Sequence, residues 1–560
     1  MAPPRGRLHE AFHPLTPRAF SMTDRRTFIG RTAAVAASIA IGRPEGAAAV
    51  LRPSPTQPPA PELEEATIAS LQSAMAKGDQ SARSIAEAYL ARIAALDKNG
   101  PALGSVIETN PEALQIADAL DGERKARGAR GPMHGIPVLL KDNIDTGDRM
   151  QTTAGSLALV GTPAPRDAFV AEQLRRAGAV ILGKTNLTEW ANFRSTHSVS
   201  GWSGRGGQTR CPYVLERNPC GSSSGSGAGV AANLAAVAVG TETDGSVVCP
   251  ASANGLVGLK PTLGLVSRAG IIPLAHSQDT AGPMARTVRD AALLLNAMTG
   301  VDPRDPATSP SAGRIAPDYT ATLDAGALRG KRLGVVRSYF GFDPGVDRVM
   351  EASLAALREA GAILVDPVVL PNAGKYDDSE GVVLRYEFKA DIAAYLATRS
   401  GADVPRSLQG LIEFNSRHAD AEMPWFGQEL FEQSEAKGPL TDKAYLSALA
   451  RNHRLSRGEG IDAALRAHQL DALVAPTGGP AWMTDFVVGD HFTGGYSTAS
   501  AVAGYPHITV PAGFVHGLPV GISFFSGAWT EPALLGIAYA FEQATGARRP
   551  PRYLEHATVP

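Results

Sequence analysis

The chain has 560 residues and carries 53 Lys and Arg against 55 Asp and Glu, so its formal net charge at pH 7 is −2. This balance argues against a nucleic-acid-binding protein, which usually carries a strong excess of positive charge. Hydrophobic residues make up 44% of the sequence, which is enough apolar material for a large buried core and favours a globular enzyme.

The first 49 residues resemble an export signal rather than the start of a fold. The pair Arg25-Arg26 precedes an apolar run from Ala33 to Ile41, and Ala47-Ala48-Ala49 then supplies small residues for cleavage. The run is about half of the ~20 residues that a transmembrane helix needs. The order is similar to a twin-arginine signal, with Met22 as an alternative start, so we expect cleavage near Ala49 and a periplasmic or secreted protein. The alternative is a basic, alanine-rich tail without a targeting role.

A proline-rich spacer and a helical hairpin follow the signal. Residues 50–61 contain five prolines, which predicts a stiff and extended segment. From Glu62, apolar residues recur at helical spacing in two runs that Gly78-Asp79 separates. We expect a hairpin of helices at one edge of a single domain that spans 62–560.

Short apolar runs alternate with helical stretches in the rest of the chain. The clearest runs are Val138–Leu140, Val180–Leu182 and Val237–Val239. Such alternation predicts an α/β fold with a sheet that helices cover on both faces. The region at about 365–455 is richer in charged and aromatic residues, and we interpret it as a helical insertion.

Two short motifs suggest other chemistries. Gly178 to Thr185 fits the phosphate-loop pattern, but its intervening Ala-Val-Ile-Leu is typical of a buried strand, so Lys184 is interpreted as a positional residue. Gly221 to Gly225 fits the nucleophile elbow of α/β-hydrolases, although Arg217 to Cys220 is a poor strand. Because histidines lie downstream, a hydrolase with Ser223 as its nucleophile stays open as an alternative.

Small residues concentrate between 219 and 263, in Pro219–Ala228, Gly240–Ser246 and Gly258–Thr262. Small side chains let the backbone approach a substrate closely. Strongly apolar segments separate the three stretches, which argues against flexible linkers. These stretches are similar to the amidase signature family. The likeness extends to further segments and covers about Glu62 to Gly546: His134–Asn143, Gly183–Glu189, Asp279–Met284 and Gly504–Gly521.

The resemblance implies the amidase signature fold, with a large, twisted, mixed and mostly parallel sheet. It also implies an enzyme that releases ammonia from carboxamides without a metal or an organic cofactor. Gly201–Gly207 and Pro219–Ser226 look closest to bacterial peptide amidases, which hydrolyse the C-terminal amide of peptides and leave internal bonds intact. Amidases for aryl, aliphatic or fatty amides, and an inactive binding protein on the same fold, remain alternatives. We expect a monomer that binds a peptide or small-molecule amide, with no nucleic acid and no stable membrane insertion.

The resemblance places a Ser–cisSer–Lys triad at Ser246, Ser222 and Lys141. A serine hydroxyl is a weak nucleophile that needs an adjacent base, and burial helps a lysine to be neutral and act as that base. Ser222 would pass the proton of Ser246 to Lys141. Backbone N–H groups would form the oxyanion hole, namely those of Thr243, Asp244, Gly245 and Ser246. Ser223 is a candidate supporting residue.

Three cysteines, Cys211, Cys220 and Cys249, are too few for a disulfide framework, and no histidine pair at ligand spacing accompanies them. Cys249 follows Ser246 by three residues and is interpreted as a small buried hydrophobic residue. We expect the substrate-binding surface to come from 365–455 and from Trp482–Tyr496.

Overall fold

The computed structural model describes residues 62–401 and 404–557. The expected signal at 1–49 and the spacer at 50–61 therefore lie outside the described residues. Within the described ranges, no helix combines the length and the apolar character that crossing a bilayer requires.

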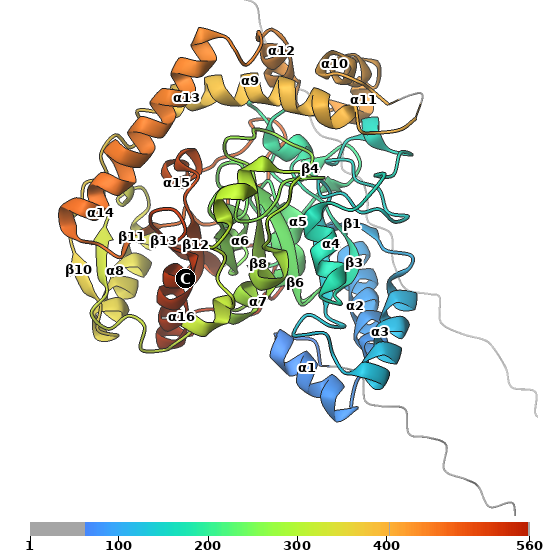
Figure 1. Ribbon diagram of the computed structural model, residues 1–560, viewed down its shortest axis with the longest axis horizontal. Coiled ribbons are helices and arrows are strands. Elements are labelled where there is room, and N and C mark those ends of the chain that lie inside the picture. The colour runs from blue at the N-terminus through green and yellow to red at the C-terminus, as the bar shows by residue number, and fades with distance from the viewer. Residues whose placement is uncertain (1–61, 402–403, 558–560) are drawn as a thin grey trace, which may run out of the picture. The chain divides into compact units, whose positions relative to one another are not determined.

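An 11-stranded sheet forms the centre of the described domain (Figure 1), with the strand order β1-β3-β2-β6-β8-β7-β12-β13-β11-β9-β10. Two further short strands, β4 and β5, pair only with each other. The strands are β1 Val106–Thr109, β2 Pro137–Lys141, β3 Val180–Thr185, β4 Trp202–Ser203, β5 Gly207–Gln208, β6 Val237–Glu242, β7 Val257–Lys260, β8 Thr280–Ala285, β9 Arg332–Val335, β10 Ile363–Val365, β11 Ala472–Pro476, β12 His507–Val515 and β13 Leu518–Phe525.

The sheet is large and mixed, as the resemblance implied. The three apolar runs of the sequence form the neighbours β3, β2 and β6, which pair in parallel, as do β11, β9 and β10. The other pairs in the described sheet are antiparallel. The sheet is therefore not mostly parallel, which differs from the expectation. One reason is the hairpin of β12 and β13, where His516 and Gly517 both have positive φ and close a two-residue turn.

Both faces of the sheet are covered. Side chains alternate between the two faces of a strand, and along β11 Ala472 and Val474 pack into the main core while Leu473 and Ala475 pack into a second cluster. The helices that accompany the sheet are α1 Ile68–Lys77, α2 Ala82–Arg92, α3 Ala113–Arg127, α4 Phe169–Arg176, α5 Ser224–Ala231, α6 Val248–Ala253, α7 Val288–Met298, α8 Pro344–Glu359, α14 Asp462–His468, α15 Thr498–Ala503 and α16 Glu531–Thr545.

The N-terminal hairpin is confirmed by α1 and α2. Thr67 and Ser81 precede these helices, and each side chain accepts a hydrogen bond from the backbone N–H three residues later. Gly78 ends α1 with a φ of 80°, which is a left-handed conformation that glycine adopts without strain. The break that the sequence placed at Gly78-Asp79 is therefore the turn between the two helices.

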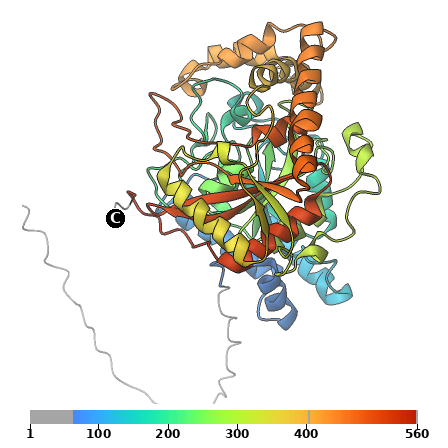
Figure 2. The same cartoon turned by 90° about the vertical axis from the view of Figure 1, so that its left-hand side faces the viewer.

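The stretch that was expected to be helical contains α9 Asp377–Leu396, α10 Leu408–Arg417, α11 Ala419–Glu422, α12 Glu429–Glu435 and α13 Lys443–Ser456. In Figure 1, α9 to α12 lie along the top and α13 runs from there down the upper left side, and in the turned view of Figure 2 this orange group again lies at the top. Phe388 and Phe431 from this group pack against Trp190 and Phe193, which follow β3. The helices thereby cover the loops beyond the end of β3, which contact the stretch Pro219–Ala228 through the hydrogen bond from the Thr188 N–H to the Ser222 carbonyl.

Candidate active site

Lys141 is the last residue of β2, and its side chain is fully buried. Its Nζ donates to Ser222 Oγ at 2.7 Å, to Thr241 Oγ1 at 2.9 Å and to the Thr241 carbonyl at 3.2 Å. The parallel pairing of β2 with β6 brings Thr241 beside Lys141. The structure therefore joins two of the three residues of the expected triad directly.

The environment of Lys141 favours a neutral amine. Burial lowers the pKa of Lys141 to about 7, and the nearby carboxylates of Asp279 and Glu242 oppose that shift. A lysine with an ordinary pKa would be almost wholly protonated at pH 7, whereas this amine has a large neutral fraction there. Lys141 can therefore accept a proton near neutral pH.

The loop that carries Ser222 packs too closely for larger side chains. A Cβ on Gly221 would lie 2.2 Å from Thr188 Oγ1, so only glycine fits at this position. The peptide bond between Gly221 and Ser222 is cis, as the resemblance implied. The Ser222 carbonyl accepts a hydrogen bond from the Thr188 N–H at 3.1 Å, which fixes the loop against the segment that follows β3.

Ser223 and Ser224 bond to nearby backbone. Ser223 Oγ donates to the Thr241 carbonyl at 3.0 Å and accepts from the Thr241 N–H at 3.1 Å. Ser224 Oγ donates to the Cys220 carbonyl at 2.7 Å. Because Ser223 is fully buried and no strand precedes it, it does not have the exposed position of a nucleophile elbow. It instead fixes Thr241, which in turn contacts Lys141.

Ser246 lies between β6 and α6. Its carbonyl accepts a hydrogen bond from the Ser223 N–H at 3.1 Å, which ties the two serine segments together. Gly245 has a φ of 77°, and this left-handed conformation turns the chain from the loop into α6. Glu242 accepts from the N–H groups of Val247 and Val248, at the start of α6. The hydrogen bonds among the described residues include none from the Ser246 hydroxyl, which lines a cleft.

The segment expected to form the oxyanion hole is held from both sides. Asp244 accepts hydrogen bonds from Ser497 and Thr498, at the start of α15. Thr243 Oγ1 donates to Asp279 at 2.6 Å. No hydrogen bond within 62–401 and 404–557 is donated by the backbone N–H groups of Thr243 to Ser246. Asp244, Gly245 and Ser246 line the cleft, so their N–H groups remain available to a ligand there.

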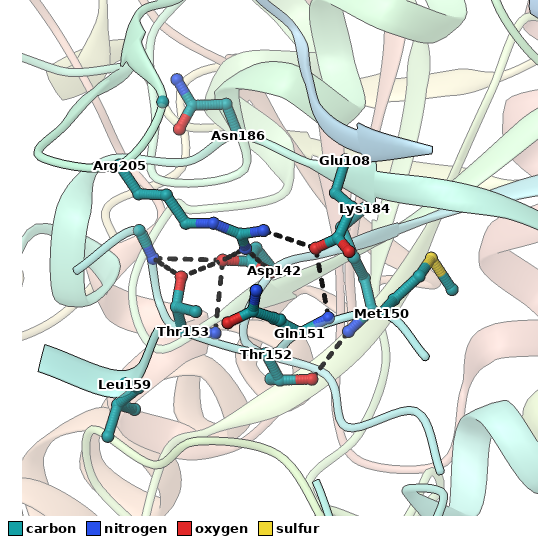
Figure 3. A network of polar contacts seen from close by, with 12 residues as sticks. Glu108, Asp142, Met150, Gln151, Thr152, Thr153, Leu159, Lys184, Asn186 and Arg205 are labelled. Carbon is teal, nitrogen blue, oxygen red and sulfur yellow. Dashed lines mark hydrogen bonds and ion pairs between the residues drawn. The ribbon is translucent and has the colours of Figure 1, made fainter. Parts of the chain in front are cut away.

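A largely buried ionic network supports the end of β2 (Figure 3). Asp142 follows Lys141 directly, and its carboxylate accepts hydrogen bonds from Thr153 and lies 3.4 Å from Arg205 Nη1. Arg205 also pairs with Glu108, the third residue of β1. In the same region Lys184 Nζ donates to Thr152 Oγ1 at 2.8 Å and to the Ile144 carbonyl at 2.6 Å. Lys184 lies within the strand β3 and holds a loop, so it is no part of a phosphate loop.

A cavity of about 510 Å³ opens beside Ser246. As expected, the segment Trp482–Tyr496 supplies much of its wall, while 365–455 contributes only Leu430 within the described lining. The full lining is Asn192, Ser195, Thr196, His197, Ser198, Ser200, Cys220, Gly221, Asp244, Gly245, Ser246, Val248, Cys249, Leu430, Thr477, Trp482, Val488, Gly489, Asp490, Phe492, Gly495, Ser497 and Thr498. The cavity is large enough for a peptide end or a molecule of similar size.

A disulfide between Cys220 and Cys249 lines this cavity. The interpretation of Cys249 as a small buried hydrophobic residue was therefore wrong, since folding brings its Cα within 6.0 Å of that of Cys220, although 29 residues separate the two, and the pair forms a disulfide. Cys220 precedes the Gly221–Ser222 bond and Cys249 follows Ser246, so the bond links the segments of both serines. Cys211 is buried and unpaired.

Reduction of the Cys220–Cys249 disulfide is expected to lower kcat/KM by about 10- to 100-fold, because small displacements of reacting groups have effects of that size. Activity and free thiols are measured together before and after treatment with a reducing agent. In a Cys211→Ala variant, every free thiol that a thiol reagent detects comes from Cys220 or Cys249. Full activity after complete reduction would show that the disulfide does not position the serines.

One group of side chains has the composition of a metal site. His276, Glu387 and Asp391 place their ligand atoms within 4.8 Å of one another in the described part of the chain. Asp391 lies 2.8 Å from Nδ1 of the imidazole, and Glu387 lies 3.4 Å from Nε2. The hydrogen bond to Asp391 raises the pKa of His276. The two carboxylates contact different ring nitrogens of His276. This is the geometry of an ion pair between the imidazole and the carboxylates rather than that of a metal site.

The sequence did not single out Thr241, Asn143 or Asp279. Asn143 Nδ2 donates to Thr241 Oγ1 at 2.9 Å, next to the contact of Thr241 with Lys141. Asp279 holds Thr243 and also accepts from the N–H groups of Leu274 and Ala275. Thr241, Asn143 and Asp279 all lie in segments that carry the family resemblance, and that resemblance was the sequence feature that could have pointed to them.

Comparison with known proteins points to one family, the amidases. The profile of the family described as Amidase matches residues 84–535. A probable amidase of Arabidopsis thaliana is 42% identical over 502 residues, which cover 88% of this chain and 92% of that protein.

Solved structures show the same relationship. The peptide amidase PAM, in complex with the competitive inhibitor chymostatin, is 55% identical with a TM-score of 0.85, and the match covers 87% of this chain and 99% of that one. The native peptide amidase of Stenotrophomonas maltophilia is 54% identical with a TM-score of 0.83 and the same coverage. The matches therefore extend over most of this chain and over nearly all of each relative.

Proposed function

The chain belongs to the amidase family and is an amide-hydrolysing enzyme, and from this premise we propose that it hydrolyses the C-terminal carboxamide of peptides to the acid and ammonia. The observation that carries the proposal is the 2.7 Å hydrogen bond from buried Lys141 to Ser222, beside a cleft that Ser246 lines. The likeness to peptide amidases over most of the chain supports peptides as the substrate class.

In the proposed mechanism Ser246 Oγ attacks the carboxamide carbon. The proton of Ser246 passes to Ser222, and Ser222 passes its own proton to neutral Lys141. The oxyanion of the tetrahedral intermediate accepts hydrogen bonds from the free N–H groups of the segment Thr243 to Ser246.

Collapse of the intermediate completes the first half of the reaction. The proton on Lys141 returns through Ser222 to the nitrogen, the C–N bond breaks, and ammonia leaves an acyl-enzyme on Ser246. Water then attacks the ester and transfers a proton along the same route, which restores the Ser246 hydroxyl and releases the acid. Ser223 supports this path by fixing Thr241, which contacts the amine of Lys141.

We also propose that the protein acts outside the cytoplasm, as the expected signal implies. The Cys220–Cys249 disulfide supports this location, because structural disulfides persist mainly in oxidising compartments. Expression with and without residues 1–49, followed by fractionation of the cells, tests it. Accumulation in the cytoplasm regardless of that segment would contradict the export proposal.

The proposed activity is tested by mass spectrometry of an N-terminally blocked peptide carboxamide after incubation with the purified chain. We expect the terminal amide to become the acid, with the internal peptide bonds intact and the Ser246→Ala variant inactive. A fluorophosphonate probe is applied in parallel. Labelling at Ser246 without conversion of any peptide amide would redirect the search to aryl, aliphatic or fatty amides. Absence of both would favour an inactive binding protein on this fold.

A further inference from the structure

The chemistry of the proposed reaction determines what fills the cleft. The leaving group of a carboxamide is ammonia, which needs little more room than a water molecule. Nearly all of the 510 Å³ cavity is therefore available to the acyl part of the substrate. If the proposed function holds, the residues that line the cavity form the specificity surface for the part of the peptide next to the amide.

One wall of the cleft is apolar. It consists of the Cys220–Cys249 disulfide, Trp482, Val488 and Phe492. Trp482 packs against Cys220, and its ring meets the Phe492 ring edge-on at 5.5 Å. Phe492 is 51% exposed and Val488 is 62% exposed, although both are large hydrophobic residues. An apolar substrate group that covers them gains from removing this surface from water.

Hydrogen bonds fix this wall beside the serine segments. Trp482 Nε1 donates to Asp490 at 3.1 Å, and the Trp482 carbonyl accepts from the Asn218 N–H at 2.7 Å. Asp490 also accepts from the N–H and the hydroxyl of Ser200. The indole is therefore preorganised next to the disulfide, and a substrate group does not need to order it on binding.

The charged groups of the cleft have one dominant sign. Asp244 and Asp490 carry carboxylates, and the described lining contains no Lys and no Arg. The lining includes one imidazole, that of His197, which lies 3.7 Å from the carboxylate of Glu429. An anionic side chain in this cleft would lose hydration without gaining a free cationic partner.

We propose that the side chain of the residue bearing the carboxamide packs against the disulfide, Trp482 and Phe492, so that the enzyme prefers peptide amides ending in apolar or aromatic residues and discriminates against those ending in Asp or Glu. The apolar wall supplies the attraction, and the carboxylates of the cleft supply the discrimination.

The first test compares blocked dipeptide amides that differ only in the last residue: Phe, Leu, Gly and Glu. We expect kcat/KM to be at least about tenfold higher for the Phe and Leu amides than for the Gly amide, and lower again for the Glu amide. Phe492→Ala should reduce the advantage of the Phe amide over the Gly amide. Equal rates for the Phe and Glu amides would overturn the inference.

A matched pair of variants tests the charge argument. Val488→Lys places a cation in the cleft wall, whereas Val487→Lys adds the same charge at a neighbouring residue that is 94% exposed and lies outside the cleft lining. We expect Val488→Lys to raise the Glu-to-Phe ratio of kcat/KM about tenfold and Val487→Lys to leave it near the wild-type value. The same ratio in both variants would contradict the assignment of this wall.

The proposed activity and the proposed specificity fail differently. If the wild-type enzyme hydrolyses none of the four amides, the proposed function fails. If it hydrolyses all of them at similar rates, the peptide amidase activity stands and the specificity inference is wrong.

Discussion

Replacement of Ser246 by alanine is expected to lower kcat for a peptide amide by about 10⁴- to 10⁶-fold, the range found when a serine nucleophile is removed from a hydrolase. The physical reason is that Ser246 is the proposed nucleophile. Its hydroxyl lines the cleft, and its segment is tied to the loop of Ser222 by the hydrogen bond from the Ser223 N–H to the Ser246 carbonyl. Turnover of a carboxamide is measured together with thermal unfolding of the variant.

The fold should tolerate this change well. The Ser246 hydroxyl makes no hydrogen bond within the described residues, and the contacts that hold its segment belong to backbone atoms and to the side chains of Glu242, Thr243 and Asp244. We therefore expect the unfolding temperature to stay close to that of the wild type. A large fall in stability would mean that the loss of activity reports unfolding instead of catalysis.

Ser223→Ala is the informative companion variant. In the wild type the Ser223 hydroxyl bonds both backbone groups of Thr241, so losing it should destabilise the protein by about 1 kcal/mol. The variant should be a weaker catalyst, but the probe should still label Ser246. The opposite pattern, with Ser246→Ala active and Ser223→Ala resistant to the fluorophosphonate, would favour the nucleophile elbow and refute the triad.

Much of the central sheet could be predicted because its strands are continuous apolar runs. Val138–Leu140, Val180–Leu182 and Val237–Val239 are buried on both faces and form the neighbours β2, β3 and β6. The antiparallel pairs were harder to predict. The hairpin of β12 and β13 depends on two residues, His516 and Gly517, in a stretch that is distinguished only by its family likeness.

The site was predictable where a motif carried it and not where strand pairing created it. Lys141 and Ser222 follow from family motifs, and the structure brings them to 2.7 Å. Thr241 lies in the Gly240–Ser246 stretch that carries the resemblance, but its contact with Lys141 could not be predicted from that stretch, because the contact arises from the parallel pairing of β2 with β6. That contact depends on two segments 100 residues apart lying side by side.

The disulfide was missed although a signal was present. Three cysteines are too few for a framework of several disulfides, but they are enough for one. Two of the three flank the serine segments, and the N-terminal signal predicts export to an oxidising compartment, where a pair such as Cys220 and Cys249 can form. Taken together, these two observations favour a single disulfide at the site.

Replacement of Lys141 by methionine is expected to lower kcat by about 10³- to 10⁴-fold, because it removes the proton acceptor and leaves the hydroxyls unactivated. Methionine keeps a similar length and fills the buried space without introducing a charge. Lys141→Arg should be as inactive, since a guanidinium stays protonated and cannot act as a base. Activity retained in both variants would exclude Lys141 as the base.

The pH profile of the wild-type enzyme gives a second readout of the same residue. Protonated Lys141 cannot accept the proton of Ser222, so the rate should be low below the pKa of about 7, rise through it, and level off above it. Asp279 opposes the lowered pKa of Lys141 through its negative charge, and its own pKa is raised by burial to about 6, so it is mainly ionised where the rate rises.

Asp279→Asn removes that charge and keeps an oxygen that can accept the hydrogen bond from Thr243. Without the carboxylate the charged form of Lys141 is less stable, so the midpoint of the pH profile should move to lower pH. A residue that only holds the loop would change the height of the profile and leave its midpoint unchanged. A shift to lower pH in Asp279→Asn, together with the inactivity of Lys141→Met, would therefore identify the titrating group as Lys141, whereas an unchanged midpoint would assign the ionisation to another residue.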